Sequence, residues 1–329
     1  MNLFRFVAFI LSCVLVTTLY AEHPDGLEGT IVVLNKSGHD ANFIDLASGE
    51  IVATLPTGRG PHELVVTSNG RWAVGTDYSG GNSLTVFDVV NKRVNRTIDL
   101  SDYPRPHGIL LLPGEEQVIV TSEASQTLVI VDFRSGEVVR SIDTTQPGSH
   151  MVALSQDGSR AYTSNGGSDS VSIIDLDGSG FQRTLDVPDR PEAITTNKAG
   201  TQIWVGSNDE EVVSVINAED GELLARWSGF EWPYRILLTR DERFAIIPDL
   251  GKHEIRFFDV ASMSELGSID LPGAMPEGVV LYPDDRTLFL ALAGRDQVLV
   301  IDIESRQILG EYSTGSAPDG IGYSPLQLR

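Results

Sequence analysis

Cysteine is nearly absent from this chain of 329 residues. The only one, Cys13, lies inside an apolar run from Phe6 to Leu19, which follows the single charge of Arg5. A short apolar run with this flanking pattern is typical of a secretory signal peptide, and we expect residues 1–21 to be one. The remaining residues, 22–329, then contain no cysteine. This excludes disulfide bonds, thiolate metal sites and a cysteine nucleophile from the mature protein.

Positive charge and further long hydrophobic runs are also scarce. Lys and Arg number 24 against 46 Asp and Glu, for a formal net charge of −22. A field of this sign repels phosphate backbones, so nucleic acid is not an expected partner. No later run is long enough for a membrane span. The sequence also lacks a Gly-x-Ser-x-Gly elbow, a phosphate-binding loop and a dinucleotide fingerprint, so no nucleotide cofactor is expected. The expected signal peptide and the cysteine-free mature chain predict a periplasmic or secreted protein.

A unit of four short β-type runs recurs along the chain, each run apolar and β-branched and each bounded by Gly, Asn or Asp turns. An acidic residue or its amide ends the third run of every unit, in steps of 43, 44, 43, 42, 42 and 43 residues. We expect these residues to cap the turns that follow them rather than to act in catalysis. They are Asp45, Asp88, Asp132, Asp175, Asn217, Asp259 and Asp302. Four strands in every 40-odd residues predict the blade of an all-β propeller.

The two ends of the repeat array are incomplete in a complementary way. Gly29 to Gly58 contains only the second, third and fourth strands of a unit, and residues 318–323 form a lone first strand. Pairing of these ends completes one further blade and protects sheet edges that an open solenoid would expose. We therefore expect a closed seven-bladed β-propeller over residues 22–329, with no second domain.

Several segments resemble the second strand of the YVTN repeat, and 156–160 and 172–175 are similar to its turn and third strand. The second-strand segments are Ile119–Glu123, Ala161–Asn165 and Trp204–Asn208. The chain therefore resembles the YVTN/YncE-like seven-bladed propellers along its whole mature length, and lactonase-type propellers more distantly. The resemblance implies the fold. Its relatives include lactonase-like enzymes and exported proteins encoded near quinoprotein alcohol oxidation systems. Some YncE-like proteins are thought to bind DNA, which the acidic charge argues against here.

Seven residues occupy the start of the predicted first strands, with separations of 45, 43, 42, 42, 43 and 42 residues. They are His62, His107, His150, Glu192, Tyr234, Glu277 and Asp319. The first strand is innermost in a propeller, so we expect these side chains to form a ring at one mouth of the central channel. His62, His107 and His150 come from consecutive blades and predict a site for a divalent transition metal, either zinc, iron, copper or manganese. Histidines with a purely structural role are the alternative.

The predicted ends of the second strands face the same mouth. Aligned along the repeat they are Asn35, Asp77, Glu123, Asn165, Asn208, Asp249 and Ala293. We expect Asp77 and Glu123 to be either further metal ligands or hydrogen-bond acceptors for the N–H of a ligating imidazole. Glu123, together with Glu192, Glu277 and Tyr234 of the first ring, is also expected to move protons in catalysis. The other three histidines, His23, His39 and His253, fit neither ring and are expected in loops.

Four arginines lie within three residues of a ring position: Arg59, Arg105, Arg190 and Arg235. In an acidic protein they are expected to form a collar that binds the carboxylate of a substrate. The alternative is that each arginine pairs with a neighbouring carboxylate of the protein.

Two functions follow from these patterns. The first is a metal-dependent hydrolase, a lactonase or esterase, acting on a small carboxylate-bearing molecule. The second is a non-enzymatic periplasmic binding or docking protein with a protein partner, for example an accessory to a quinoprotein-type oxidation system.

Overall fold

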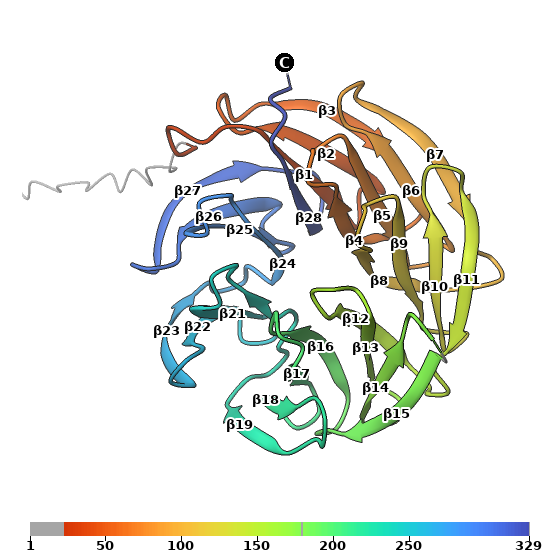
Figure 1. Cartoon of the computed structure of the whole chain (residues 1–329). Helices are drawn as coiled ribbons and strands as arrows, with labels where there is room; N and C mark the ends of the chain where they lie inside the picture. The colour runs from red at the N-terminus through yellow and green to blue at the C-terminus, as the bar shows by residue number, and fades with distance from the viewer. Residues whose placement is uncertain (1–22, 179, 329) are drawn as a thin grey trace, which may run out of the picture.

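The computed structural model describes residues 23–178 and 180–328, so the expected signal peptide lies outside the described residues. Within this part of the chain the regular elements are strands, grouped into seven sheets of four antiparallel strands. The sheets stand around a central axis (Figure 1). The prediction of a seven-bladed β-propeller is thus confirmed. No helix in the described ranges is long and apolar enough to cross a membrane.

The blades follow one another along the chain. The shared blade contains β28 (Pro318–Ser324), β1 (Thr30–Asn35), β2 (Asp40–Asp45) and β3 (Ile51–Pro56). The next three contain β4 (Pro61–Val66), β5 (Trp72–Asp77), β6 (Ser83–Asp88) and β7 (Arg93–Asp99); β8 (Pro106–Leu111), β9 (Gln117–Ser122), β10 (Thr127–Asp132) and β11 (Glu137–Asp143); and β12 (Ser149–Leu154), β13 (Arg160–Asn165), β14 (Ser170–Asp175) and β15 (Gly180–Asp186). The last three contain β16 (Pro191–Thr196), β17 (Gln202–Ser207), β18 (Val212–Asn217) and β19 (Leu223–Ser228); β20 (Leu237–Leu238), β21 (Phe244–Asp249), β22 (Glu254–Asp259) and β23 (Ser264–Asp270); and β24 (Pro276–Leu281), β25 (Thr287–Leu292), β26 (Gln297–Asp302) and β27 (Gln307–Ser313).

The ring closes between the two ends of the array, as predicted. β28 pairs antiparallel with β1, with Thr30 opposite Ser324 and Val32 opposite Gly322. In Figure 1 the first and last strands lie side by side in one blade. Closure leaves neither end of the array with an open inner edge.

The recurring acidic residues cap turns, as expected. In each of the seven blades the side-chain oxygen at the end of the third strand accepts a hydrogen bond from a backbone N–H two or three residues later, at 2.7–3.3 Å. This local capping explains why the sequence repeats Asp or Asn at this position.

The apolar core lies between blades. In one cluster, Val74 and Val86 of β5 and β6 pack with Val118 and Val120 of the following blade. The second strands are buried on both faces, whereas the fourth strands, such as β19, carry exposed residues at the perimeter. Buried sheet-to-sheet packing of this kind holds the first strands at a fixed position around the channel.

Candidate functional site

The backbone at the start of the first strand presents the ring residues to the channel. In six blades the residue just before this strand has a left-handed φ of 52–72°. In the same six blades the pairing of the first and second strands is irregular at the ring residue, for example between Pro106 and Ile109. A left-handed residue followed by a bulge re-aims the next side chain. The remaining blade instead has an isolated bridge between Pro233 and Asp249.

The second ring differs from its predicted register in part. Strand pairing places Asp77 opposite Pro61, but Ser122, not Glu123, opposite Pro106. Glu123 is therefore equivalent to Tyr78 and Lys36, each one residue beyond the second strand. A slip of one residue turns a strand side chain to the opposite face. The predicted second ring therefore combined residues whose side chains point to opposite faces of the blade.

Asp77 lies inside its blade and not in the channel. Its Oδ2 accepts hydrogen bonds from Ser83 (2.6 Å) and Thr85 (3.0 Å). Burial is the main reason that the pKa of Asp77 rises to about 6, against lowering hydrogen bonds from Ser83, Thr85 and Gly58. This placement gives no support to the prediction that Asp77 is a metal ligand.

A cavity of about 670 Å³ occupies the mouth at which the ring residues gather. We call it the chamber. Its lining includes the three ring histidines and the ring residues Glu192, Tyr234 and Glu277. Residues from the connections after the second strands complete the wall, among them Lys36, Tyr78 and Glu123. Lys36 and Tyr78 were not predicted from the sequence. They can be identified once the second strands are aligned in the correct register, because they occupy the same position as Glu123 in their blades.

His62 and His107 of the chamber wall form a compact group with Glu63, which itself lines a different cavity. One ligand atom from each lies within 4.8 Å of the other two. The ring centroids of His62 and His107 are 4.5 Å apart. Burial and the neighbouring His150 and His62 hold the pKa of His107 well below its usual range, so His107 is a neutral imidazole. Glu63, which follows a ring residue directly, was not singled out from the sequence.

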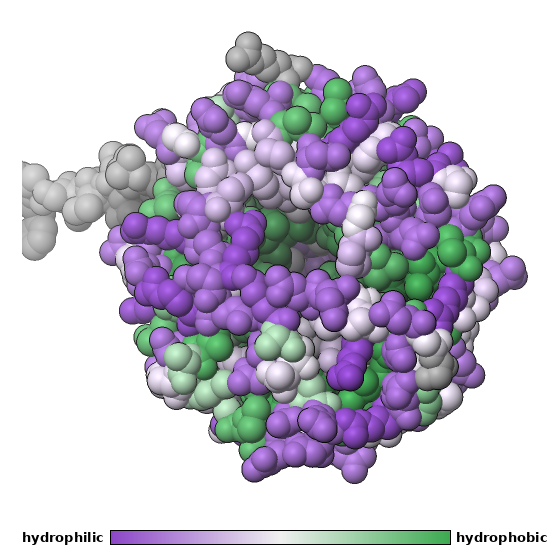
Figure 2. Space-filling model, in the orientation of Figure 1, coloured by the Kyte–Doolittle hydropathy of each residue, from purple (hydrophilic) through white to green (hydrophobic). Residues whose placement is uncertain are grey.

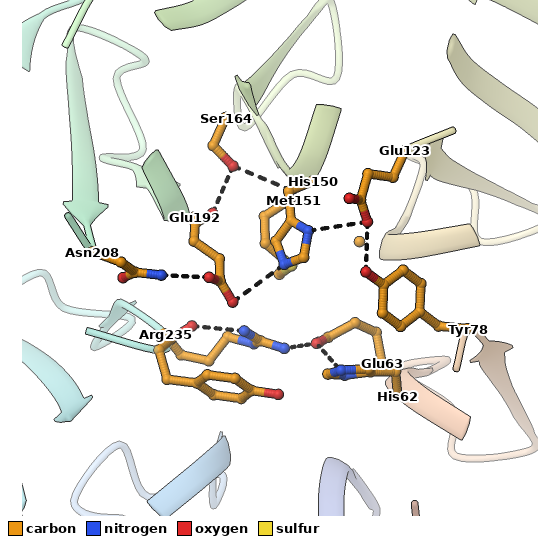
Figure 3. Close-up of polar contacts among 12 residues, drawn as sticks. His62, Glu63, Tyr78, Glu123, His150, Met151, Ser164, Glu192, Asn208 and Arg235 are labelled. Carbon is orange, nitrogen blue, oxygen red and sulfur yellow. Dashed lines mark hydrogen bonds and ion pairs between the residues drawn. The ribbon is translucent and has the colours of Figure 1, made fainter. Parts of the chain in front are cut away.

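The ring centroid of His150 is 3.7 Å from that of His107, but His150 is not a member of this group, and both of its nitrogens face carboxylates (Figure 3). Nε2 is 3.2 Å from Glu192 and Nδ1 is 3.6 Å from Glu123. Burial alone lowers the pKa of His150, but the two carboxylates outweigh it and raise the pKa to about 9. Burial likewise raises the pKa of Glu123, yet His150, Tyr78 and Arg105 lower it to about 2. His150 is therefore a buried cation between two anions.

Two further carboxylates lie on the other side of the ring. Lys36 Nζ is 2.7 Å from Glu277 and 3.5 Å from Asp319, and Asp319 Oδ2 is 2.6 Å from His62 Nδ1. Burial and the Asp319 charge raise the pKa of Glu277 despite Lys36. The hydroxyl of Tyr234 donates to Asp319 at 3.2 Å, and burial with the nearby carboxylates holds its pKa far above the usual range.

The four arginines do not form one collar. Arg105 and Arg190 line the chamber, where Arg105 pairs with Glu123 at 3.1 Å and Arg190 with Asp209 at 3.3 Å. Arg59 is exposed and does not line it. Arg235 is buried and forms an ion pair with Glu63 (Figure 3). It lines a different cavity. Pairing with neighbouring carboxylates, the alternative given above, thus describes three of them.

Comparison with known proteins supports the fold and nothing finer. The chain matches no protein-family model, and no curated protein resembles it in sequence. A protein of unknown function from Desulfotomaculum acetoxidans is similar in structure, with a TM-score of 0.75 and 16% identity over 90% of this chain and 99% of that one. Hydrazine synthase from Kuenenia stuttgartiensis has a TM-score of 0.70 and 16% identity, over 81% and 90% of the two chains. A streptogramin B lyase has a TM-score of 0.68 and 16% identity, over 80% of this chain and 87% of that one. The chain is thus a seven-bladed β-propeller with a polar, charged chamber at one channel mouth.

Proposed function

We propose that the chamber holds a divalent transition metal ion, either zinc, iron, copper or manganese, between His62, His107 and Glu63. The observation that carries this proposal is the spacing of their ligand atoms, all within 4.8 Å of one another on buried or half-buried side chains. Two imidazoles and one carboxylate are a common donor set of catalytic metal sites, and such a set leaves a position for water or substrate.

The surroundings of the two histidines suit this role. His62 Nδ1 lies 2.6 Å from Asp319, and a carboxylate behind a ligating imidazole is the usual partner that fixes its orientation. Among the described residues, His107 Nδ1 is buried without a hydrogen-bond partner. A neutral imidazole is the form that binds metal, and the pKa of His107 favours that form.

We infer further that the protein is a metal-dependent hydrolase of a small, carboxylate-bearing ester or lactone. Arg105 and Arg190 line the chamber and are half exposed, so each can contact an anionic substrate beside its own carboxylate partner. A bound metal would polarise the scissile carbonyl and lower the pKa of a water molecule. Glu192, hydrogen-bonded by Asn208, is held against His150 and is positioned to accept a proton. Glu277, whose pKa is raised, is suited to return one to the leaving group.

We also propose a protein family and a cellular compartment for this chain. The repeat supports a YVTN/YncE-like protein, and the first 21 residues support export to the periplasm or beyond the cell. Two of the similar structures carry the names of enzymes, a synthase and a lyase. At 16% identity they give no guide to the substrate.

The first test is the metal content of the purified mature protein after equilibration with zinc and dialysis, measured by mass spectrometry. We expect one ion per chain in the wild type and in His253→Ala, a histidine outside the chamber, and none in His107→Ala. Wild-type protein that retains no ion would refute the metal site.

The second test is hydrolysis of a panel of lactones and esters, with and without a carboxylate group. We expect zinc-dependent turnover that Glu192→Gln reduces by about 10²–10⁴-fold in kcat, the usual contribution of a general acid or base. If the metal-loaded protein hydrolyses none of the panel, the hydrolase proposal fails while the metal site stands.

A further inference from the structure

A second cavity, of about 640 Å³, opens at the opposite mouth of the channel. We call it the funnel. The far ends of the first strands of all seven blades line it with aliphatic side chains, including the half-buried Leu111, Leu154, Leu237 and Val279. Figure 2 shows a hollow at the centre of one face, with hydrophobic residues in its depth and hydrophilic ones at its rim. In a chain with a net charge of −22, this aliphatic lining differs from the surrounding surface.

The floor of the funnel carries one cation, Arg235, the only Lys or Arg among its described lining residues. Its Nη1 donates to the carbonyl of Tyr234 at 2.6 Å, and its guanidinium lies 4.1 Å from the centroid of the Tyr234 ring. Its side chain is only 10% exposed. These contacts hold the guanidinium in one orientation, as bidentate binding of a carboxylate requires.

Glu63 connects the funnel with the chamber. It forms the ion pair with Arg235 on the funnel side, and it belongs to the group with His62 and His107 on the chamber side. A metal bound to Glu63 draws its negative charge away from Arg235. The buried guanidinium then keeps the charges of Asp319 and Glu277 nearby but loses its ion-pair partner, which is costly unless another anion takes that place.

We propose that the funnel is a second binding site, for a monocarboxylate with an aliphatic body. The carboxylate binds the Arg235 guanidinium, and the aliphatic body packs against the walls around Leu111 and Leu154. A cavity of this size holds a small molecule, and apolar walls with few convergent polar groups are typical of such sites.

Competition for Arg235 links the two cavities. The incoming carboxylate and Glu63 need the same guanidinium, so the site is weak while Glu63 is free and stronger once Glu63 is engaged by metal. Linkage makes the effect reciprocal, so the carboxylate also strengthens metal binding. The metal dependence rests on the function proposed above, whereas the funnel site itself does not.

Octanoate is a suitable probe, measured by isothermal titration calorimetry against the mature protein with and without zinc. We expect zinc to tighten octanoate binding at least about fivefold, within the usual range of coupling between two sites. Glu63→Gln, which frees Arg235 at constant side-chain size, should bind octanoate tightly without zinc and show no further gain with it. Arg235→Gln should abolish binding, whereas Arg243→Gln, which removes a surface arginine paired with Glu304, should not change it.

Acetate and 1-octanol separate the two halves of the recognition, since acetate lacks the aliphatic body and octanol lacks the charge. Both should bind much more weakly than octanoate. Near-ultraviolet circular dichroism checks that each variant is folded. If Glu63→Gln does not fold, the octanoate affinity of the wild type with and without zinc still tests the coupling.

The inference is overturned if Arg235→Gln binds octanoate like the wild type, or if folded Glu63→Gln shows no gain. If zinc binds but leaves octanoate affinity unchanged, the metal site stands and the coupling fails. If zinc does not bind while Glu63→Gln gains octanoate affinity and Arg235→Gln loses it, the funnel site is supported and the metal proposal fails.

Discussion

Asp77 is a buried carboxylate at a position that two other blades fill with asparagine. Asn165 donates from Nδ2 to Ser170 and Ser172, and Asn35 makes the equivalent contacts with Asp40 and Asn42. Asp77 accepts from Ser83 and Thr85 in the same geometry. The position therefore needs a polar group that joins the second and third strands, and a negative charge is not required there.

We predict that Asp77→Asn stabilises the protein near neutral pH. Because burial raises the folded-state pKa of Asp77 to about 6, from an ordinary value of 3.8, the folded state binds the proton more tightly than the unfolded state. Stability from this group is therefore present at low pH and is lost as pH rises from about 4 to about 6, by about 3 kcal/mol. Asparagine removes that loss, so the difference between variant and wild type should grow across this window.

Urea unfolding of both proteins between pH 4 and pH 7.5 measures the effect. Asp88→Asn is the control of opposite sign. Burial raises the pKa of Asp88, but hydrogen bonds from Asn91 and the charges of Arg71 and Arg93 outweigh burial, so the net pKa is lowered. The charge of Asp88 therefore stabilises the fold as pH rises. A pH-independent difference for Asp77→Asn would contradict the account, and loss of bound zinc would restore Asp77 as a ligand.

At the scale of elements, a hydrogen bond ties the turn after the second strand to the entry of the next blade. A side-chain acceptor in this turn receives a backbone N–H from just before the next first strand, at 2.8–3.0 Å. The acceptors are His39, Asn82, Asp169, His253 and Asp296. His39 and His253 thus lie in turns, as expected, and bind neighbouring backbone rather than the channel.

Asp296 provides a test of this contact, because its Oδ1 accepts from the Ala317 N–H at 2.8 Å, next to the closing strand β28. We predict that Asp296→Ala lowers the free energy of unfolding by about 1–2 kcal/mol, because it loses this hydrogen bond and places alanine at a left-handed φ of 53° that Asp and Asn adopt more easily. Asp296→Asn keeps an oxygen acceptor, as Asn82 does, and should lose much less. Equal losses in the two variants would show that charge, not the hydrogen bond, matters here.

The sequence predicts the elements better than it predicts which face a residue occupies. Pro and the recurrent spacing located the first ring, and six of its seven residues line the chamber. The second ring failed where the predicted alignment placed Glu123 with Asp77, because polar residues occur at two successive positions there. Glu63 was not singled out and Arg235 was assigned to a collar, because their ion pair joins blades that lie far apart in the chain.

At the scale of the whole molecule, the fold depends on the pairing of β28 with β1. The fold class, the number of blades and the closure were all predictable, because the repeat period and the incomplete ends are local features of the sequence. The two cavities were not, because their shape depends on how seven blades converge.

We predict that truncation after residue 317, which removes β28, abolishes cooperative thermal unfolding. The deletion exposes the inner edge of β1 and removes Ile321 from the core beside it. A circular permutant that joins residue 328 to residue 29 through a short linker and begins at residue 59 should keep a wild-type melting transition. A cooperative transition in the truncated chain would show that closure is not needed.

The most direct test of the metal site is a crystal structure of the mature protein grown with zinc, with anomalous diffraction recorded at the zinc edge. The account predicts an anomalous peak in the chamber at about 2.0–2.2 Å from the His62 and His107 imidazoles and the Glu63 carboxylate. The peak should be absent from His107→Ala crystals grown in the same way. A chamber without a peak, or a peak bound by His150 and its two carboxylates instead, would contradict the account.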